Sequence, residues 1–182
     1  TLDAFTEWSA RYISADAARR AALVEEGVRL AQVRRPVFKQ LIQDDPKDAL
    51  AKTVPMVVRQ KLPASIVALL EERISGTGGL EVLAVSPDSD PSEPIYRHIA
   101  TLGDREWRAY VYGRRAEQMS LERTMMNGVG IDSVMALDKS PVRPLEIGEI
   151  PDVTKKAVET CPVSGLSTAV EREPSIAPPP IE

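Results

Sequence analysis

The sequence has very few of the residues that form disulfide bonds, metal sites or catalytic pairs. Its 182 residues include one cysteine and one histidine. A single cysteine cannot close an internal disulfide, which excludes the class of small domains stapled by disulfides. The chain by itself also cannot supply the several imidazole or thiolate ligands of a typical zinc site. We therefore expect it to hold no cofactor of its own.

Aromatic residues, charge of one sign and long apolar runs are also scarce. Aromatic residues make up 4% of the chain, so its core must be built mainly from Leu, Val, Ile, Ala and Met. The formal net charge is -4 with both signs mixed, which gives no electrostatic reason to expect a nucleic-acid partner. Basic pairs such as Arg34 with Arg35 are predicted to lie on solvated helix faces. No apolar run approaches roughly 18 residues, so no membrane span is predicted.

What the sequence does contain is a helical first half, over residues 1–75. Apolar residues recur at helical spacing on both sides of a joint at residues 14–16, which predicts two helices. Pro36 lies inside the second pattern and should either kink that helix or end it. Pro63 stands where a further helix begins, and the "SGTGG" stretch would end that helix at Gly76.

The pattern changes to that of strands between residues 80 and 147. Gly103 and Asp104 separate two strand patterns, as a hairpin turn would. Two more strands are predicted around a turn at residues 139–141. We therefore predict one α+β domain over residues 1–147, in which N-terminal helices pack on a C-terminal antiparallel β-meander.

Residues 148–182 have the composition of a linker. They are rich in Pro and Ser and end in "APPPIE", and such proline runs favour extended geometry. We predict an extended Pro-rich tail, which commonly leads to a further domain. This tail carries Cys161, the only cysteine of the chain.

Catalysis by the chain itself is not predicted. His98 lies inside a strand pattern, where an imidazole is usually structural or faces solvent. A nucleophilic pair of Cys161 and His98 would need the tail to fold back onto that strand, and a third group to orient the imidazole. We expect that the fragment is not an enzyme.

The surroundings of Cys161 predict an accessible thiol. Polar residues surround it in "ETCPVSGLS", and an accessible thiolate is a strong zinc ligand. On an extended segment it could fill the open fourth position of a catalytic zinc and displace the water that the metal activates. Proline would stiffen this segment, and glycine would let its backbone lie close to the cleft of an enzyme. The predicted inhibitory segment comprises Cys161, Pro162, Val163, Ser164 and Gly165.

Three stretches resemble the leading region of large exported bacterial proteins: residues 18–85, "AYVYGRR" at 109–115 and "GIDSVMALDKSPVRPLE" at 130–146. Some of those proteins carry a metzincin-type zinc metalloprotease domain downstream. For such proteases the resemblance implies a pro-domain that assists folding and keeps the zymogen latent, with a cysteine near its end on the catalytic zinc. It gives Cys161 that role of cysteine switch, although "CPVSG" differs from the switch motif PRCGxPD. It also implies a secreted or cell-surface location.

The leading hypothesis is thus an inhibitory, folding-assisting pro-domain of a secreted zinc metalloprotease. Its partner would be the protease domain in cis, downstream of residue 182, and the zinc would belong to that domain. Cleavage at Arg172 in the tail would release the enzyme. The alternative is a non-catalytic binding or spacer domain at the N-terminus of a large exported surface protein. A HExxHxxGxxH motif further along the gene would distinguish the two.

Overall fold

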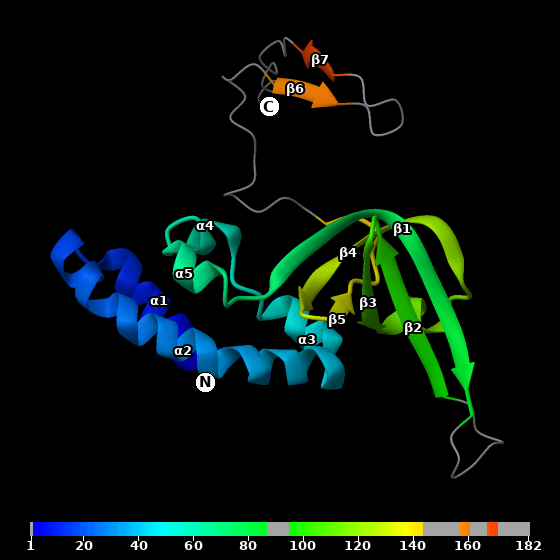
Figure 1. The fold of residues 1–182 in the computed structure, drawn as a ribbon, viewed down its shortest axis with the longest axis horizontal. Coiled ribbons are helices and arrows are strands. Elements are labelled where there is room, and N and C mark those ends of the chain that lie inside the picture. The colour runs from blue at the N-terminus through cyan, green and yellow to red at the C-terminus, as the bar shows by residue number, and fades with distance from the viewer. Residues whose placement is uncertain (1, 87–94, 144–156, 161–166, 171–182) are drawn as a thin grey trace, which may run out of the picture. The chain divides into compact units, whose positions relative to one another are not determined.

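The structure, a computed structural model, describes residues 2–86, 95–143, 157–160 and 167–170. The chain divides into two compact units, residues 1–144 and 145–182. The first unit has N-terminal helices followed by a closed barrel of strands (Figure 1), which confirms the predicted α+β class. Its elements are α1 (Leu2–Ser14), α2 (Ala17–Asp44), α3 (Pro46–Ala51), α4 (Met56–Arg59), α5 (Ala64–Val67), β1 (Glu72–Val85), β2 (Ile95–Leu102), β3 (Arg105–Tyr110), the 3-10 helix η1 (Gly113–Glu117), β4 (Leu121–Ile131) and β5 (Val134–Leu137).

The helices α1 and α2 form a hairpin whose joint lies at residues 14–16, as predicted. The side chain of Asp16 caps α2 by accepting a hydrogen bond from the backbone N–H of Arg19, at 2.9 Å. Across the hairpin, the indole N–H of Trp8 donates to the carbonyl of Leu23 at 3.1 Å. Gly27 permits this close approach, because a Cβ atom there would lie 2.2 Å from the Trp8 ring.

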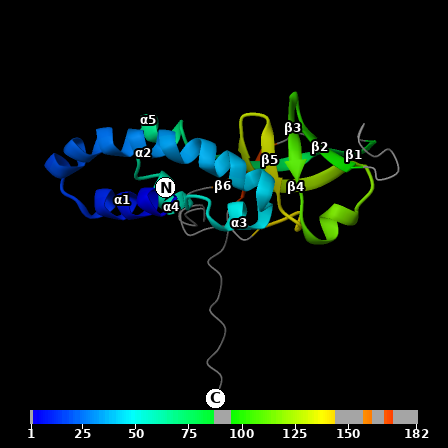
Figure 2. The same ribbon diagram turned by 90° about the horizontal axis from the view of Figure 1, so that it is seen from below.

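The helix α2 continues through Pro36, which excludes the second of the two predicted alternatives, an end of the helix there. Pro36 lies on the exposed side of the helix, where water can bond the carbonyl that loses its partner. Beyond it, Phe38 and Ile42 are fully buried and hold the second half of α2 in place. Figure 2 shows α2 running from α1 to α3 and the barrel.

This length lets α2 contribute to two separate cores. The first lies between α1, the front half of α2 and the α4–α5 segment, and its buried residues are Phe5, Trp8, Tyr12, Ala31, Val54, Leu62, Ile66 and Leu70. The second lies between the end of α2, α3 and the outer face of β4 and β5, and its buried residues are Phe38, Ile42, Ala49, Val129, Ile131, Val134 and Ala136. A third core fills the barrel itself.

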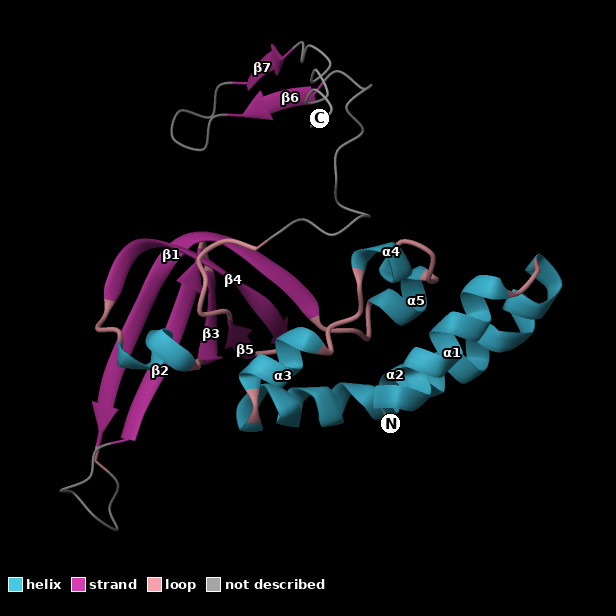
Figure 3. Ribbon diagram, turned by 180° about the vertical axis from the view of Figure 1, so that it is seen from behind, coloured by secondary structure: helices cyan, strands magenta, loops and turns pink. Residues whose placement is uncertain are grey.

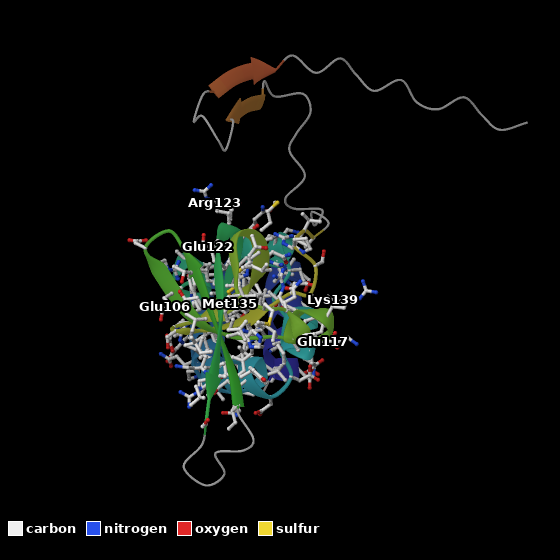
Figure 4. All side chains as sticks on the ribbon, turned by 90° about the vertical axis from the view of Figure 1, so that its right-hand side faces the viewer. Glu106, Glu117, Glu122, Arg123, Met135 and Lys139 are labelled. Carbon is white, nitrogen blue, oxygen red and sulfur yellow. The ribbon has the colours of Figure 1, made fainter. Side chains whose placement is uncertain are left out.

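The strands form a closed barrel in the order β1-β2-β3-β5-β4, and not the predicted antiparallel meander. The strand β3 pairs with β5 in parallel, with Ala109 opposite Met135, because η1 carries the chain away before β4 returns beside β1. Met135 lies inside the barrel, and Figure 4 shows Glu106 and Lys139 on either side of it. Five-stranded Greek-key barrels include the OB-fold, but this architecture serves unrelated functions and identifies no ligand by itself.

The turns confirm one prediction and correct another. Gly103 has a φ of +61° between β2 and β3, as expected for the hairpin turn predicted there. The last two strands of the barrel instead meet at Asp132 and Ser133, ahead of the predicted turn at residues 139–141. Asp132 has a φ of +53°, a left-handed conformation that Asp adopts more readily than most residues.

The predicted helix ending at Gly76 is also wrong, because β1 begins at Glu72 and runs through the "SGTGG" stretch. These glycines allow the backbone of β1 to lie very close to the backbone of the neighbouring strands. A Cβ atom at Gly78 would lie 1.9 Å from the backbone oxygen of Thr101 on β2. The local signal for a helix end thus serves close strand packing instead.

The second unit contains a pair of short strands, β6 (Ala157–Thr160) and β7 (Ser167–Val170). They pair antiparallel, with Ala157 opposite Val170 and Thr160 opposite Ser167. This pairing differs from the extended tail predicted for residues 148–182. Both strands contain the β-branched residues Val and Thr, which favour a strand. Among the helices that the structure describes, none has the length and apolar composition that crossing a bilayer requires.

The Gly78→Ala variant should be less stable by about 3 kcal/mol or more, because a methyl group cannot fit against backbone that is fixed in the barrel. Gly79→Ala is the matched control, since nothing lies within 4 Å of a Cβ atom at Gly79. Urea unfolding of both proteins measures the difference. Equal unfolding midpoints would contradict the close contact between the backbones of β1 and β2 at Gly78.

Candidate partner-binding groove

An apolar groove lies between α1 and the segment of residues 51–58. Its volume is about 680 Å³. One wall is the face of α1 that repeats at helical spacing, and the other wall follows α3 up to the start of α4. The apolar and small lining residues are Leu2, Phe5, Thr6, Ser9, Ala10, Ile13, Ser14, Ala51, Thr53, Val54, Pro55 and Val58.

The charged residues of the groove are few, and two of them already have partners. Lys52 pairs with Asp48 one turn earlier, at 2.8 Å, and this contact raises the pKa of Lys52. Arg34 lies beneath the groove with a side chain that is 2% exposed. Its guanidinium faces the rings of Phe38 at 4.4 Å and Phe5 at 5.5 Å, a cation–π arrangement.

Arg34 is neutralised by a carboxylate that is itself completely buried. Glu71, the residue before β1, has no exposed side-chain area and accepts a hydrogen bond from Arg34. Its other oxygen accepts from the backbone N–H of Val54 at 2.7 Å and lies 3.2 Å from the guanidinium of Arg59. Removing one partner of such a buried network leaves an uncompensated charge, which is strongly unfavourable.

A second cleft, of about 600 Å³, has Glu71 in its lining. It is lined by the end of α4, the residues after α5, the start of β1 and the β4–β5 turn. Arg35 reaches into it from α2 and donates to the carbonyl of Leu69 at 3.1 Å and to Asp132 at 2.6 Å. Arg34 lines the groove, whereas Glu71 and Arg59 line the cleft, so the two hollows border different members of one ion-pair network.

Sequence reasoning missed this network, because it placed Arg34 on a solvated helix face. The position itself contains a signal. Arg34 lies three residues after Ala31 and four before Phe38, both fully buried, so it belongs to the inner stripe of α2. Nothing in the local sequence, however, pairs it with Glu71, which lies 37 residues later.

His98 lies in the wall of the barrel. It lies in β2, is 7% exposed and pairs across the sheet with Val82 on one side and Ala109 on the other. Its Nε2 atom has no hydrogen-bond partner among the residues that the structure describes. Burial lowers the pKa of the imidazole below its ordinary value of 6.5, so the neutral form is favoured in the folded barrel.

The residues predicted to form the inhibitory segment, Cys161, Pro162, Val163, Ser164 and Gly165, lie outside the described residues, as does Arg172. Cys161 directly follows β6, and residues 161–166 connect β6 to β7. Within the described ranges, no group of three or more His, Cys, Asp or Glu side chains could hold a metal ion. Comparisons with models of protein families, with characterised proteins and with solved structures find no match.

The Glu71→Gln variant should lose about 3 to 5 kcal/mol of unfolding free energy, since Arg34 and Arg59 would keep their charges without a buried counter-ion. Glu72→Gln is the matched control at the next position. Glu72 pairs with Arg105 at the surface, where both side chains are about half exposed, and its loss should change stability little. Denaturant titration distinguishes the two, and similar losses in both variants would contradict the buried network.

Stability should fall as the pH drops below about 6.5, because the unfolded chain then binds a proton at His98 that the folded barrel disfavours. The slope should not exceed about 1.4 kcal/mol per pH unit for one group. His98 is the only histidine, so no other side chain with an ordinary pKa titrates between pH 5 and 7. His98→Leu should flatten the dependence in that window. An unchanged slope in this variant would show that another group is responsible.

Proposed function

We propose that this chain is a non-catalytic domain that binds a partner protein through the groove at α1. The observation that supports this proposal is the lining of the groove. Most of its side chains are apolar or carry a hydroxyl group, and they surround a guanidinium that already has its counter-ion. Such a surface offers apolar area that a partner can cover, as the central part of a protein interface requires. A buried, neutralised arginine beneath it keeps the shape of the groove rigid.

The partner that we propose is a zinc metalloprotease domain, which the chain would keep latent and help to fold. The thiolate of Cys161 would bind the catalytic zinc and displace the water that attacks the substrate. The pairing of Thr160 with Ser167 supports this, because it brings together the two ends of the segment that contains Cys161. Inhibition would weaken at low pH, where the thiol keeps its proton.

The partner proposal has a direct test with three variants of the chain and the active protease domain encoded downstream of it. Cys161→Ala should abolish the zinc-dependent part of the inhibition. Ala10→Arg should weaken binding about tenfold or more, because a charged side chain would enter the apolar groove from an exposed helix position. Ala18→Arg makes the same change at an exposed position of α2 outside the groove and should bind as the unmodified chain does.

The outcomes separate the two parts of the proposal. Equal inhibition by the unmodified chain and by Cys161→Ala would remove the zinc ligand but leave groove binding standing. Equal binding by Ala10→Arg and Ala18→Arg would remove the groove. A gene without a HExxHxxGxxH motif downstream would end the protease proposal and favour a binding or spacer domain of an exported surface protein.

A further inference from the structure

The strands β1 and β2 extend past the other strands of the barrel as a two-stranded arm (Figure 1). The pairing of β1 with β4 ends at Leu80, and β2 pairs with β3 only from His98 onward. Within the described part of the chain, residues 83–85 and 95–97 therefore pair only with each other, and we call them the arm. A two-stranded ribbon of this kind has little stability of its own.

The arm also buries little apolar surface. Leu83 is 46% exposed, Ile95 54% and Tyr96 62%. At the base of the arm, the backbone N–H of Val82 donates to the hydroxyl of Ser120 at 2.9 Å, which attaches β1 to the residues just before β4. Segments with few buried contacts open at a lower free-energy cost than the whole domain. The arm is therefore the part of the barrel from which opening should begin.

His98 lies directly beside this attachment, because it is the cross-strand partner of Val82. Side chains alternate between the two faces of a strand, so His98 points to the same side of β2 as Ala100, which is fully buried in the barrel core. His98 is 7% exposed, and its Nε2 atom has no hydrogen-bond partner among the described residues. A buried imidazole without a partner strongly favours its neutral form.

Charged groups on the surrounding elements do not offset this burial. The buried residues of the barrel core are all uncharged. Glu81 of β1 and Arg108 of β3 belong to the opposite face of the sheet, because each is one residue away from a cross-strand partner of His98. Among the described residues, burial is the cause of the lowered pKa of His98. The other titratable residues of the adjoining segments are Tyr96, Tyr112, Arg114, Arg115, Glu117, Glu122, Arg123 and Asp138.

We propose that His98 is a pH-dependent switch, whose neutral form keeps the arm attached to the barrel and whose protonated form opens it. Opening would let water reach the imidazole. It would also expose the inner faces of β1 and β2, including Leu80 and Ala100, which have no exposed area in the closed barrel. The helical cores contain no such group, since His98 is the only histidine of the chain. The inference does not depend on which partner the chain binds.

Proton linkage determines the size and direction of the effect. The open form binds the proton at the ordinary pKa of 6.5, whereas burial lowers the pKa of the closed form. Each pH unit below 6.5 therefore favours the open form about tenfold, until the closed form itself becomes protonated. Above pH 6.5 both forms are neutral at His98, and the arm should be insensitive to pH.

Amide hydrogen exchange of the full chain, corrected for the intrinsic effect of pH on exchange, tests the switch. Between pH 6.5 and 5.5, the protection of the Val82 amide should fall up to about tenfold relative to that of Ala31, which lies in the core of the helix hairpin. His98→Leu should abolish this difference between the two pH values. Tyr96→Leu, on the same face of β2 but 62% exposed, is the matched control and should keep it.

Nuclear magnetic resonance of the imidazole in the unmodified chain gives a second readout that needs no variant. The His98 ring signals should change over the same pH range in which the Val82 amide loses protection. Equal loss of protection at Val82 and Ala31 would show global unfolding instead of arm opening and would overturn the proposal. An unchanged Val82 amide, or the same loss in His98→Leu as in the unmodified chain, would overturn it as well.

Discussion

The buried carboxylate of Glu71 lies where the helices end and the barrel begins, and it joins the segments on which both parts depend. It accepts hydrogen bonds from Arg34 on α2 and from the backbone of Val54, and it contacts Arg59 on α4. An unpaired charge at this depth would be very unfavourable, so arrangements of the helices that separate these groups are disfavoured. The network therefore contributes more to selecting one arrangement than to net stability.

A second constraint is the length of α2, which takes part in one core with α1 and in another with the barrel (Figure 3). Arg35 and Lys39 strengthen this connection, since both bind Asp132 at the turn between β4 and β5. The apolar groove and the cleft, which is lined by both basic and acidic residues, are consequences of this arrangement. Arg34 lines the groove, and its partner Glu71 lines the cleft, so the two surfaces border the same ion-pair network.

The errors of sequence reasoning in the barrel have a common physical cause. Helix joints and tight turns depend on a few neighbouring residues, so the joint at residues 14–16 and the turn at Gly103 were predictable. The glycines of β1 look the same locally whether they end a helix or pass close to another strand. Only the contact of Gly78 with Thr101, made across the sheet, distinguishes the two. The parallel pairing of β3 with β5 likewise depends on strands that are not consecutive.

By itself, the sequence determined the α+β class, the joint between the first two helices and the β2–β3 turn, because periodicity, capping and turn chemistry act over a few residues. It also identified the single thiol of Cys161 as the residue to test on a partner's zinc. The tertiary structure alone decided the barrel order, the groove and the burial of Arg34 against Glu71. Those features depend on side chains that are distant in sequence and on the high free energy of an unpaired buried charge, which no local pattern records.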